Sequence, residues 1–191
     1  MKKTGLFFGS FNPIHVGHLI LAEYFATQTE LDEVWLVVTP QNPLKKKDSL
    51  LDQYLRLDLV HRAIAGNVNL RASDVEFKLD KPSYTIHTLI HLREQHPDRQ
   101  FSLIMGEDNL VSLPRWKNYE QILEQFEVLV YPRVGQHPSE LAGHPHVHLV
   151  QAPVVEISSS QIRNLLKNQQ SIRYLVPDAI HDYLLKEGFY I

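Results

Sequence analysis

The chain has 191 residues, of which 43% are hydrophobic and 21% charged, and it contains no cysteine. That length suits one α/β domain, and the lack of cysteine excludes a disulfide framework, a cysteine-based zinc site and a cysteine nucleophile. Lysine and arginine number 19 against 22 aspartate and glutamate, so no basic excess favours nucleic-acid binding. No apolar run approaches the roughly 20 residues of a membrane span, and the apolar amino-terminal stretch breaks at Gly9 and Pro13, too early for a signal peptide. We therefore expect a cytoplasmic protein without a nucleic-acid or membrane partner.

Runs of strand length alternate along the chain with stretches whose apolar residues recur every three or four positions, which is typical of amphipathic helices. The expected strands are residues 4–8, 34–38, 68–72, 101–105 and 128–131. The expected helices are residues 15–29, 51–65, 84–95 and 119–125, followed by two short carboxy-terminal helices at 159–168 and 178–186. Strands joined by crossover helices predict a Rossmann-like α/β fold with a doubly wound parallel sheet. We expect a single domain over residues 1–191, in which residues 156–191 form a helical subregion packed on the sheet.

Two stretches depart from this alternation. Residues 40–49 form a polar loop after the second strand, and residues 132–145 are rich in proline, glycine and histidine, which predicts a mobile connection. In open parallel sheets, ligands bind beyond the carboxyl ends of the strands. The loops that follow the strands should therefore carry the site residues.

The loop after the first strand, residues 9–18, has the sequence GSFNPIHVGH. His15 and His18 are expected on the first turn of the following helix, three positions apart and on one face. Beside the positive end of the helix dipole, two imidazole donors and free backbone N–H groups make a phosphate site. Gly17 is expected to leave the helix surface open to a ligand. A zinc site at the two histidines and a pair of ordinary, partly buried histidines are the alternatives.

A second candidate phosphate site lies at residues 157–163, ISSSQIR. Ser158 and Gln161 form a capping box, which predicts a helix amino terminus here. Three consecutive hydroxyls exceed what one cap needs, and Arg163 adds a bidentate phosphate donor within one turn. A well-capped helix without a ligand is the alternative.

Other loops hold further candidates. Lys45 is expected to close over polyphosphate, while Lys46 and Lys47 are expected on a solvated surface. Gly106 and Asp108 suit a ribose diol, or else simply begin a helix with dipole-matched acids.

Trp116 stands in a polar stretch, where an indole often stacks on a flat ligand, although a hydrophobic lid is the alternative. Tyr84 and Thr85 open a helix whose free N–H groups could hold a small carboxylate. A further group comprises His137, His144, His146 and His148; its metal-binding interpretation competes with that of a loose loop.

Together these motifs resemble the nucleotidylyltransferases with a His-x-Gly-His signature, and among them the bacterial nicotinate mononucleotide adenylyltransferases. The likeness runs over nearly the whole chain, through GSFNPIHVGH (9–18), PQNPLK (40–45), PSYT (82–85), GEDNL (106–110), RW (115–116), YPR (131–133), ISSSQIR (157–163) and LVPDAIHDYL (175–184). Ser10, Asn12, Leu44 and Ser160 stand where members of this family often have Thr, Asp, His and Thr.

The resemblance implies roles for these residues. The expected ATP-binding set is Gly9, Ser10, Phe11, His15, His18, Gly106, Asp108, Arg133, Ile157, Ser159, Ser160 and Arg163. The expected mononucleotide-binding set is Lys45, Tyr84, Thr85 and Trp116, with the indole stacked on the nicotinate ring. The expected catalytic residues are His15, His18, Lys45 and Arg163, with His18 nearest the reacting α-phosphate.

The implied reaction joins ATP to nicotinate mononucleotide, giving deamido-NAD and pyrophosphate in NAD biosynthesis. The acceptor phosphate has a second pKa of about 6 and is already ionised at neutral pH, so it attacks the α-phosphorus without a general base. Mg²⁺ is expected to be carried by the ATP β and γ oxygens, with no ligand from the protein. Nicotinamide mononucleotide or phosphopantetheine as acceptor, a non-catalytic ATP sensor of the same fold, and a homo-oligomer remain open.

Overall fold

The structure is a computed structural model that describes residues 1–40, 50–80, 82–135 and 139–191. Its strands are β1 (Lys2–Gly9), β2 (Glu33–Val38), β3 (Leu70–Ser73), β4 (Arg99–Gly106), β5 (Glu127–Tyr131) and β6 (Val147–Leu149). Its helices are α1 (Val16–Gln28), α2 (Gln53–Ala63), α3 (Thr85–Gln95), α4 (Glu107–Ser112), α5 (Tyr119–Gln125), α6 (Ser159–Lys167) and α7 (Asp178–Glu187). Three 3₁₀ turns complete it, η1 (Val75–Lys78), η2 (Leu113–Arg115) and η3 (Glu140–Gly143). Within these ranges, no helix is both long and apolar enough to cross a bilayer.

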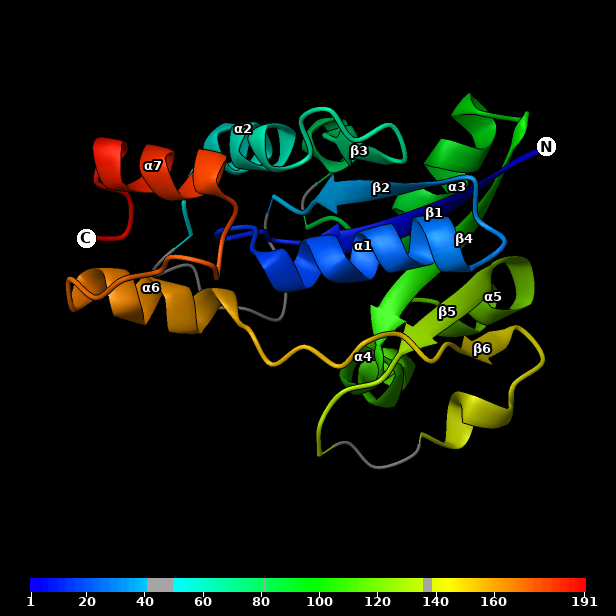
Figure 1. Cartoon of the computed structure of the whole chain (residues 1–191). Helices are drawn as coiled ribbons and strands as arrows, with labels where there is room; N and C mark the ends of the chain where they lie inside the picture. The colour runs from blue at the N-terminus through cyan, green and yellow to red at the C-terminus, as the bar shows by residue number, and fades with distance from the viewer. Residues whose placement is uncertain (41–49, 81, 136–138) are drawn as a thin grey trace.

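The six strands form one parallel sheet in the order β3-β2-β1-β4-β5-β6. The chain first builds outward from β1 through β2 to β3, then returns to the other side of β1 and builds outward through β4 to β6. This reversal places the topological switch point between β1 and β4, where doubly wound sheets bind their ligands. In Figure 1, β1 starts at the N label and runs toward the side of the molecule that carries α6 and α7. The Rossmann-like fold that the sequence predicts is confirmed.

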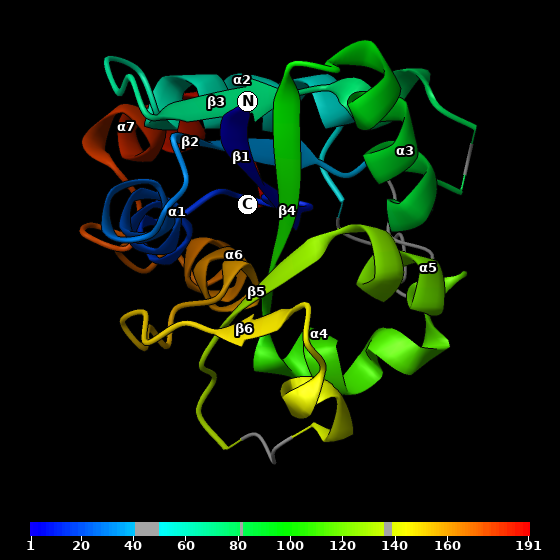
Figure 2. The ribbon, with the colours of Figure 1, turned by 90° about the vertical axis from the view of Figure 1, so that its right-hand side faces the viewer.

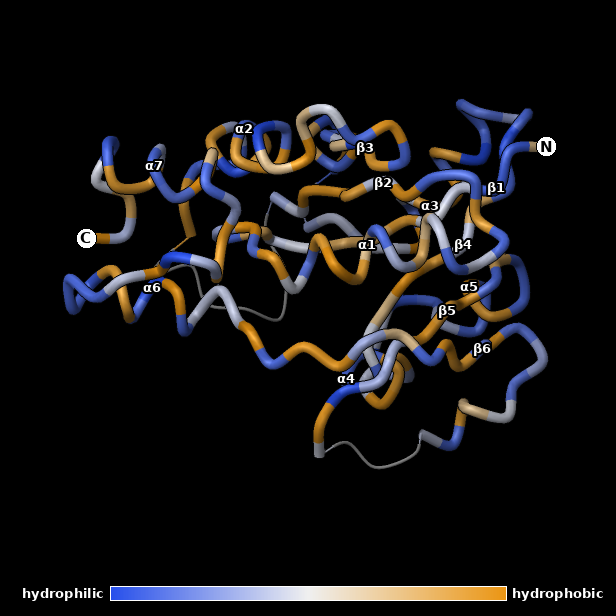
Figure 3. The backbone as a smooth tube through the Cα atoms, viewed as in Figure 1, coloured by the Kyte–Doolittle hydropathy of each residue, from blue (hydrophilic) through white to orange (hydrophobic). Residues whose placement is uncertain are grey.

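Helices cover both faces of the sheet (Figure 2). Neighbouring strand residues point to opposite faces, so Phe7 and Leu36 pack with α1, α2, α6 and α7, whereas Leu6 and Val37 pack with α3, α4 and α5. All six residues of β2 are buried, as expected for a strand in the interior of such a sheet. Apolar segments, orange in Figure 3, follow the central strands.

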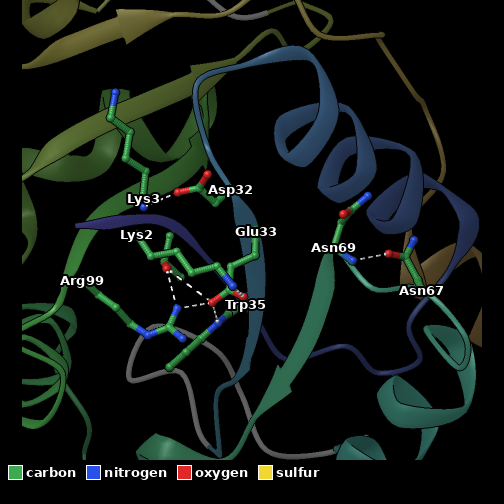
Figure 4. A network of polar contacts seen from close by, with 9 residues as sticks. Lys2, Lys3, Asp32, Glu33, Trp35, Asn67, Asn69 and Arg99 are labelled. Atoms are coloured by element: carbon green, nitrogen blue, oxygen red, sulfur yellow. Dashed lines mark hydrogen bonds and ion pairs between the residues drawn. The ribbon is translucent and has the colours of Figure 1, made fainter.

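The amino edge of the sheet is tied together by side-chain charges (Figure 4). One carboxylate oxygen of Glu33 accepts hydrogen bonds from the indole Nε1 of Trp35, at 2.6 Å, and from the guanidinium of Arg99. The other pairs with the ammonium of Lys2, at 2.5 Å. Burial alone would raise the pKa of Glu33, but these donors and cations outweigh it and the pKa is lowered. At the opposite edge, the carboxyl ends of the strands are followed by the loops that carry the candidate site residues.

The structure also corrects several details. Val68 is 92% exposed and lies before β3, which begins at Leu70. Strand β6 was not predicted, because three residues are too few to show a clear period. Helix α4 begins after Gly106 with Glu107 and Asp108 in its first turn, which is the alternative given for these residues. His15 is the N-cap of α1 and not part of its first turn.

Candidate active site

The amino termini of α1 and α6 meet at the loop after β1. Ser159 Oγ donates to the carbonyl of Pro13 at 2.9 Å, and Arg163 Nη1 donates to the carbonyl of Asn12 at 2.8 Å. These contacts join residues that lie far apart in the sequence. The two candidate phosphate sites are therefore parts of one corner of the molecule.

The start of α6 lies where the sequence predicts it, with the Ser158 half of the expected capping box formed. Ser158 Oγ accepts a hydrogen bond from the backbone N–H of Gln161, at 3.1 Å. Ser160 Oγ accepts one from Arg163 Nη2, at 3.1 Å. Ser158 thus caps the helix, whereas Ser160 holds the Arg163 guanidinium toward the loop.

The imidazoles of His15 and His18 stack on each other, with ring centroids 3.7 Å apart and planes 27° apart. The backbone N–H of His15 donates to Nδ1 of His18, at 3.3 Å. Because Nδ1 accepts, a neutral His18 carries its proton on Nε2, which makes that atom a hydrogen-bond donor. Edge-on contacts with Phe7 and Phe11 hold the His18 ring from the core side.

His15 is buried, with 5% of its surface exposed. Burial, and secondarily the positive charge of Arg133, lower the pKa of His15 to about 4. The imidazole is therefore neutral at neutral pH. Its ring also covers Gly17: a Cβ added there would lie 3.1 Å from the imidazole Nδ1 and 3.2 Å from Val155. The expectation that Gly17 leaves an open helix surface is wrong, because this glycine makes room for protein side chains.

The residues expected at the ribose and adenine gather at the ends of β4 and β5. Arg133 Nε lies 3.6 Å from Asp108 Oδ1, and its Nη2 donates to the hydroxyl of Tyr131 at 3.3 Å. The backbone N–H of Arg133 donates to Glu107 Oε2 at 2.9 Å. A Cβ at Gly106 would collide with the Asp108 carboxylate, so only glycine admits this carboxylate so close to the strand end.

The residues expected at the mononucleotide ring meet at the start of α3. Tyr84 is the N-cap of this helix, with an extended backbone and no side-chain cap, and Thr85 is its first residue. Tyr84 and Trp116 are half-buried and pack against the same apolar cluster. The ammonium of Lys117 lies 4.5 Å from the centroid of the Tyr84 ring. This contact connects the Trp116 segment to the helix start and places the cation of Lys117, which belongs to none of the predicted sites, beside Tyr84.

The chain matches the cytidylyltransferase-like family over residues 6–165. It is 51% identical over 190 residues to a Flavobacterium johnsoniae protein named "Probable nicotinate-nucleotide adenylyltransferase", and 98% of each chain is covered. A protein of the same name from Cytophaga hutchinsonii is 53% identical over 188 residues, again with 98% of each chain covered. The chain belongs to the nicotinate-nucleotide adenylyltransferase family.

Solved structures have the same fold. The Plasmodium falciparum nicotinic acid mononucleotide adenylyltransferase complexed with NaAD has a TM-score of 0.84 at 21% identity, over 100% of this chain and 98% of that one. The same protein complexed with APC has a TM-score of 0.82 at 20% identity, with the same coverage. At these identities the likeness supports the architecture of the family and not the roles of single residues.

Some of the predicted residues lie beyond the part of the chain that the structure describes. Lys45, Lys46, Lys47 and Leu44 lie outside the described residues, as does His137. Within the described ranges, no three acidic or histidine side chains gather as they would around a metal ion. The imidazole of His148 instead lies 2.5 Å from a carboxylate oxygen of Glu127.

Sequence reasoning missed two side chains that hold the loop after β1. Tyr190, near the carboxyl end of the chain, donates from its hydroxyl to Asn12 Oδ1 at 2.6 Å, and the same oxygen accepts the backbone N–H of Leu51 at 3.1 Å. Arg56 is fully buried beneath the loop. The sequence does contain a sign that Arg56 is buried. It lies three and four positions before Leu59 and Val60, on the buried face of α2, where an apolar residue is expected.

Proposed function

We propose that this chain transfers the adenylyl group of ATP to nicotinate mononucleotide, releasing pyrophosphate and forming deamido-NAD. One observation carries the proposal: two helix amino termini, the His15–His18 pair and Arg163 converge on the loop after β1. Such a corner offers hydrogen-bond donors to a polyphosphate. Relatives at 51% and 53% identity carry the name of this activity.

The chemistry is a direct displacement. An oxygen of the acceptor 5′-phosphate forms a bond to the α-phosphorus of ATP, and the bond from that phosphorus to the bridging oxygen breaks, so pyrophosphate leaves with the electron pair. The attacking phosphate is already an anion, so a general base is not needed. The protein's task is to align two polyanions and to stabilise the charge of the transition state. In this proposal, Nε2 of His18 donates to the α-phosphate and Arg163 neutralises the leaving phosphates.

The neutral state of His15 suits a supporting role. Its imidazole stacks on that of His18 and is buried behind it. A neutral His15 therefore adds no positive charge behind the His18 ring and serves as an uncharged packing surface for it.

The nucleoside end of ATP is proposed to lie at the ends of β4 and β5. Asp108 suits the ribose hydroxyls, because a carboxylate accepts from both, and Arg133 lies beside the base. Arg133 Nε lies 3.6 Å from Asp108 Oδ1. We propose that the ribose hydroxyls bind to Asp108 at the position of this ion pair.

Magnesium is proposed to arrive with ATP. Donors such as the Ser160 hydroxyl and the Arg163 guanidinium dominate the polyphosphate corner, and such a set complements phosphate oxygens rather than a metal ion. When bound, Mg²⁺ would neutralise charge on the β and γ phosphates. Because ATP is a cytoplasmic substrate, we place the reaction in the cytoplasm.

Nicotinate is the preferred acceptor in this proposal. The start of α3 offers backbone N–H groups, that of Thr85 among them. Trp116 offers a stacking surface, and Lys117 adds a positive charge beside Tyr84. A carboxylate gains from both the helix dipole and the ammonium, whereas the amide of nicotinamide does not.

The test is turnover on three acceptors. Pyrophosphate release and product mass would be measured with ATP and nicotinate mononucleotide, nicotinamide mononucleotide or phosphopantetheine. We expect the highest kcat/KM with nicotinate mononucleotide. ATP binding without pyrophosphate release from any acceptor would instead support a sensor, and preference for phosphopantetheine would overturn the acceptor assignment.

A further inference from the structure

Arg56 is a buried cation surrounded by backbone carbonyls. None of its surface is exposed. Its Nε donates to the carbonyl of Leu51 at 2.8 Å, and its Nη2 donates to that of Pro40 at 2.9 Å. Its Nη1 donates to the carbonyls of Ser10, at 2.6 Å, and Thr39, at 2.8 Å. Among the described residues, no carboxylate forms an ion pair with this guanidinium.

These four acceptors belong to three separate segments at the carboxyl edge of the sheet. Ser10 follows β1, Thr39 and Pro40 follow β2, and Leu51 precedes α2. One planar guanidinium thus joins the segments that surround the polyphosphate corner. Burial lowers the pKa of Arg56 from its ordinary value, yet an arginine stays protonated in proteins, so the charge persists. A buried cation is costly unless it is fully hydrogen-bonded, and these four carbonyls supply that compensation.

The contact with Ser10 has a consequence for the next residue. The peptide bond between Ser10 and Phe11 is trans, so the N–H of Phe11 points opposite to the Ser10 carbonyl and away from Arg56. Phe11 has a φ of 45°, which non-glycine residues rarely adopt. Its ring packs against the end of β1, where a Cβ at Gly9 would lie 2.8 Å from it. Such a conformation persists only where its surroundings fix it, and Arg56 fixes the carbonyl that precedes it.

We propose that Arg56 is a positioning residue for adenylyl transfer: its hydrogen bonds to the ends of β1 and β2 hold the Ser10–Phe11 peptide so that the Phe11 N–H faces the ATP phosphates. This inference rests on the proposed function. Arg56 touches no substrate, so it acts through the loop. Its planar fork is needed, because one ammonium nitrogen cannot reach four carbonyls spread over three segments.

Arg56→Lys tests this idea directly, since it keeps the charge and removes the fork. On folded protein, we expect kcat to fall at least about tenfold, with a smaller change in KM for ATP, because misplaced donors affect the transition state most. Arg56→Met, which also removes the charge, should lower kcat at least as much; if it does not fold, Arg56→Lys carries the test. Folding would be checked by near-UV circular dichroism. Activity would be assayed well below the melting temperature of each variant.

Arg62→Lys is the matched control. Arg62 lies on the same helix, but its guanidinium pairs with Asp58 on the surface, at 2.8 Å, and should leave kcat and KM unchanged. A folded Arg56→Lys variant with kcat within about twofold of the wild type would overturn the positioning role. If the wild type itself releases no pyrophosphate with any acceptor, the proposed function fails, and this inference fails with it.

Discussion

His15 and His18 stack face to face at the start of α1, with their ring centroids 3.7 Å apart. The two rings nevertheless have different surroundings, because burial keeps His15 neutral while Nδ1 of His18 accepts a backbone hydrogen bond. The pair therefore offers one oriented donor, at Nε2 of His18, and one uncharged support.

His18→Ala removes the proposed donor to the α-phosphate. We expect kcat to fall about 10²-fold, as for the loss of one transition-state donor, with a modest change in the dissociation constant of ATP. Steady-state kinetics combined with ATP titration by calorimetry would measure both quantities. Turnover like that of the wild type would remove His18 from the mechanism.

His15 should make the protein sensitive to acid. Its pKa of about 4 in the folded chain lies below the ordinary 6.5, so the unfolded chain takes up a proton first as the pH falls. Stability is therefore fully present above pH 6.5 and is lost as the pH falls toward 4, by about 2 kcal/mol at pH 5. Urea unfolding of the wild type and of His15→Gln at pH 7.5 and pH 5 would measure it.

The His15→Gln variant should lose less stability between these two pH values than the wild type. The lowered pKa of Glu33 acts in a separate window, below its ordinary 4.5, and does not interfere. Equal losses in the two proteins would contradict the neutral, buried state of His15.

Trp116→Ala should chiefly affect the mononucleotide. Loss of one aromatic stacking surface would raise the KM of that substrate about tenfold, while the KM of ATP stays near the wild-type value. Initial rates with each substrate varied in turn would separate the two constants. If the ATP constant rises instead, the indole does not stack on the acceptor.

Lys117→Gln should weaken the preference for nicotinate over nicotinamide mononucleotide. The ammonium lies 4.5 Å from the Tyr84 ring centroid and is exposed to solvent, so its effect on a bound carboxylate is modest. We expect the kcat/KM ratio of nicotinate to nicotinamide mononucleotide to fall about threefold. Lys186→Gln, on the distant α7, is the control and should leave this ratio unchanged.

The main elements and the two candidate phosphate sites could be predicted from sequence because their signals are local. The β-branched run of β2 and the N-cap serine Ser158 are examples. Arg56 could not be assigned its role, because its partners are backbone carbonyls from other segments, which a sequence does not display. The burial of His15 likewise depends on packing between distant segments, among them the one that carries Val155 over Gly17.

The hydrogen bond from Tyr190 to Asn12 links the segment after α7 directly to the loop after β1. Loss of the Tyr190 hydroxyl would remove this support from Asn12 without touching any strand. A fluorescent dye attached next to Tyr190 would therefore lie close to the proposed triphosphate site. Its emission would report ATP binding without a substitution in that site.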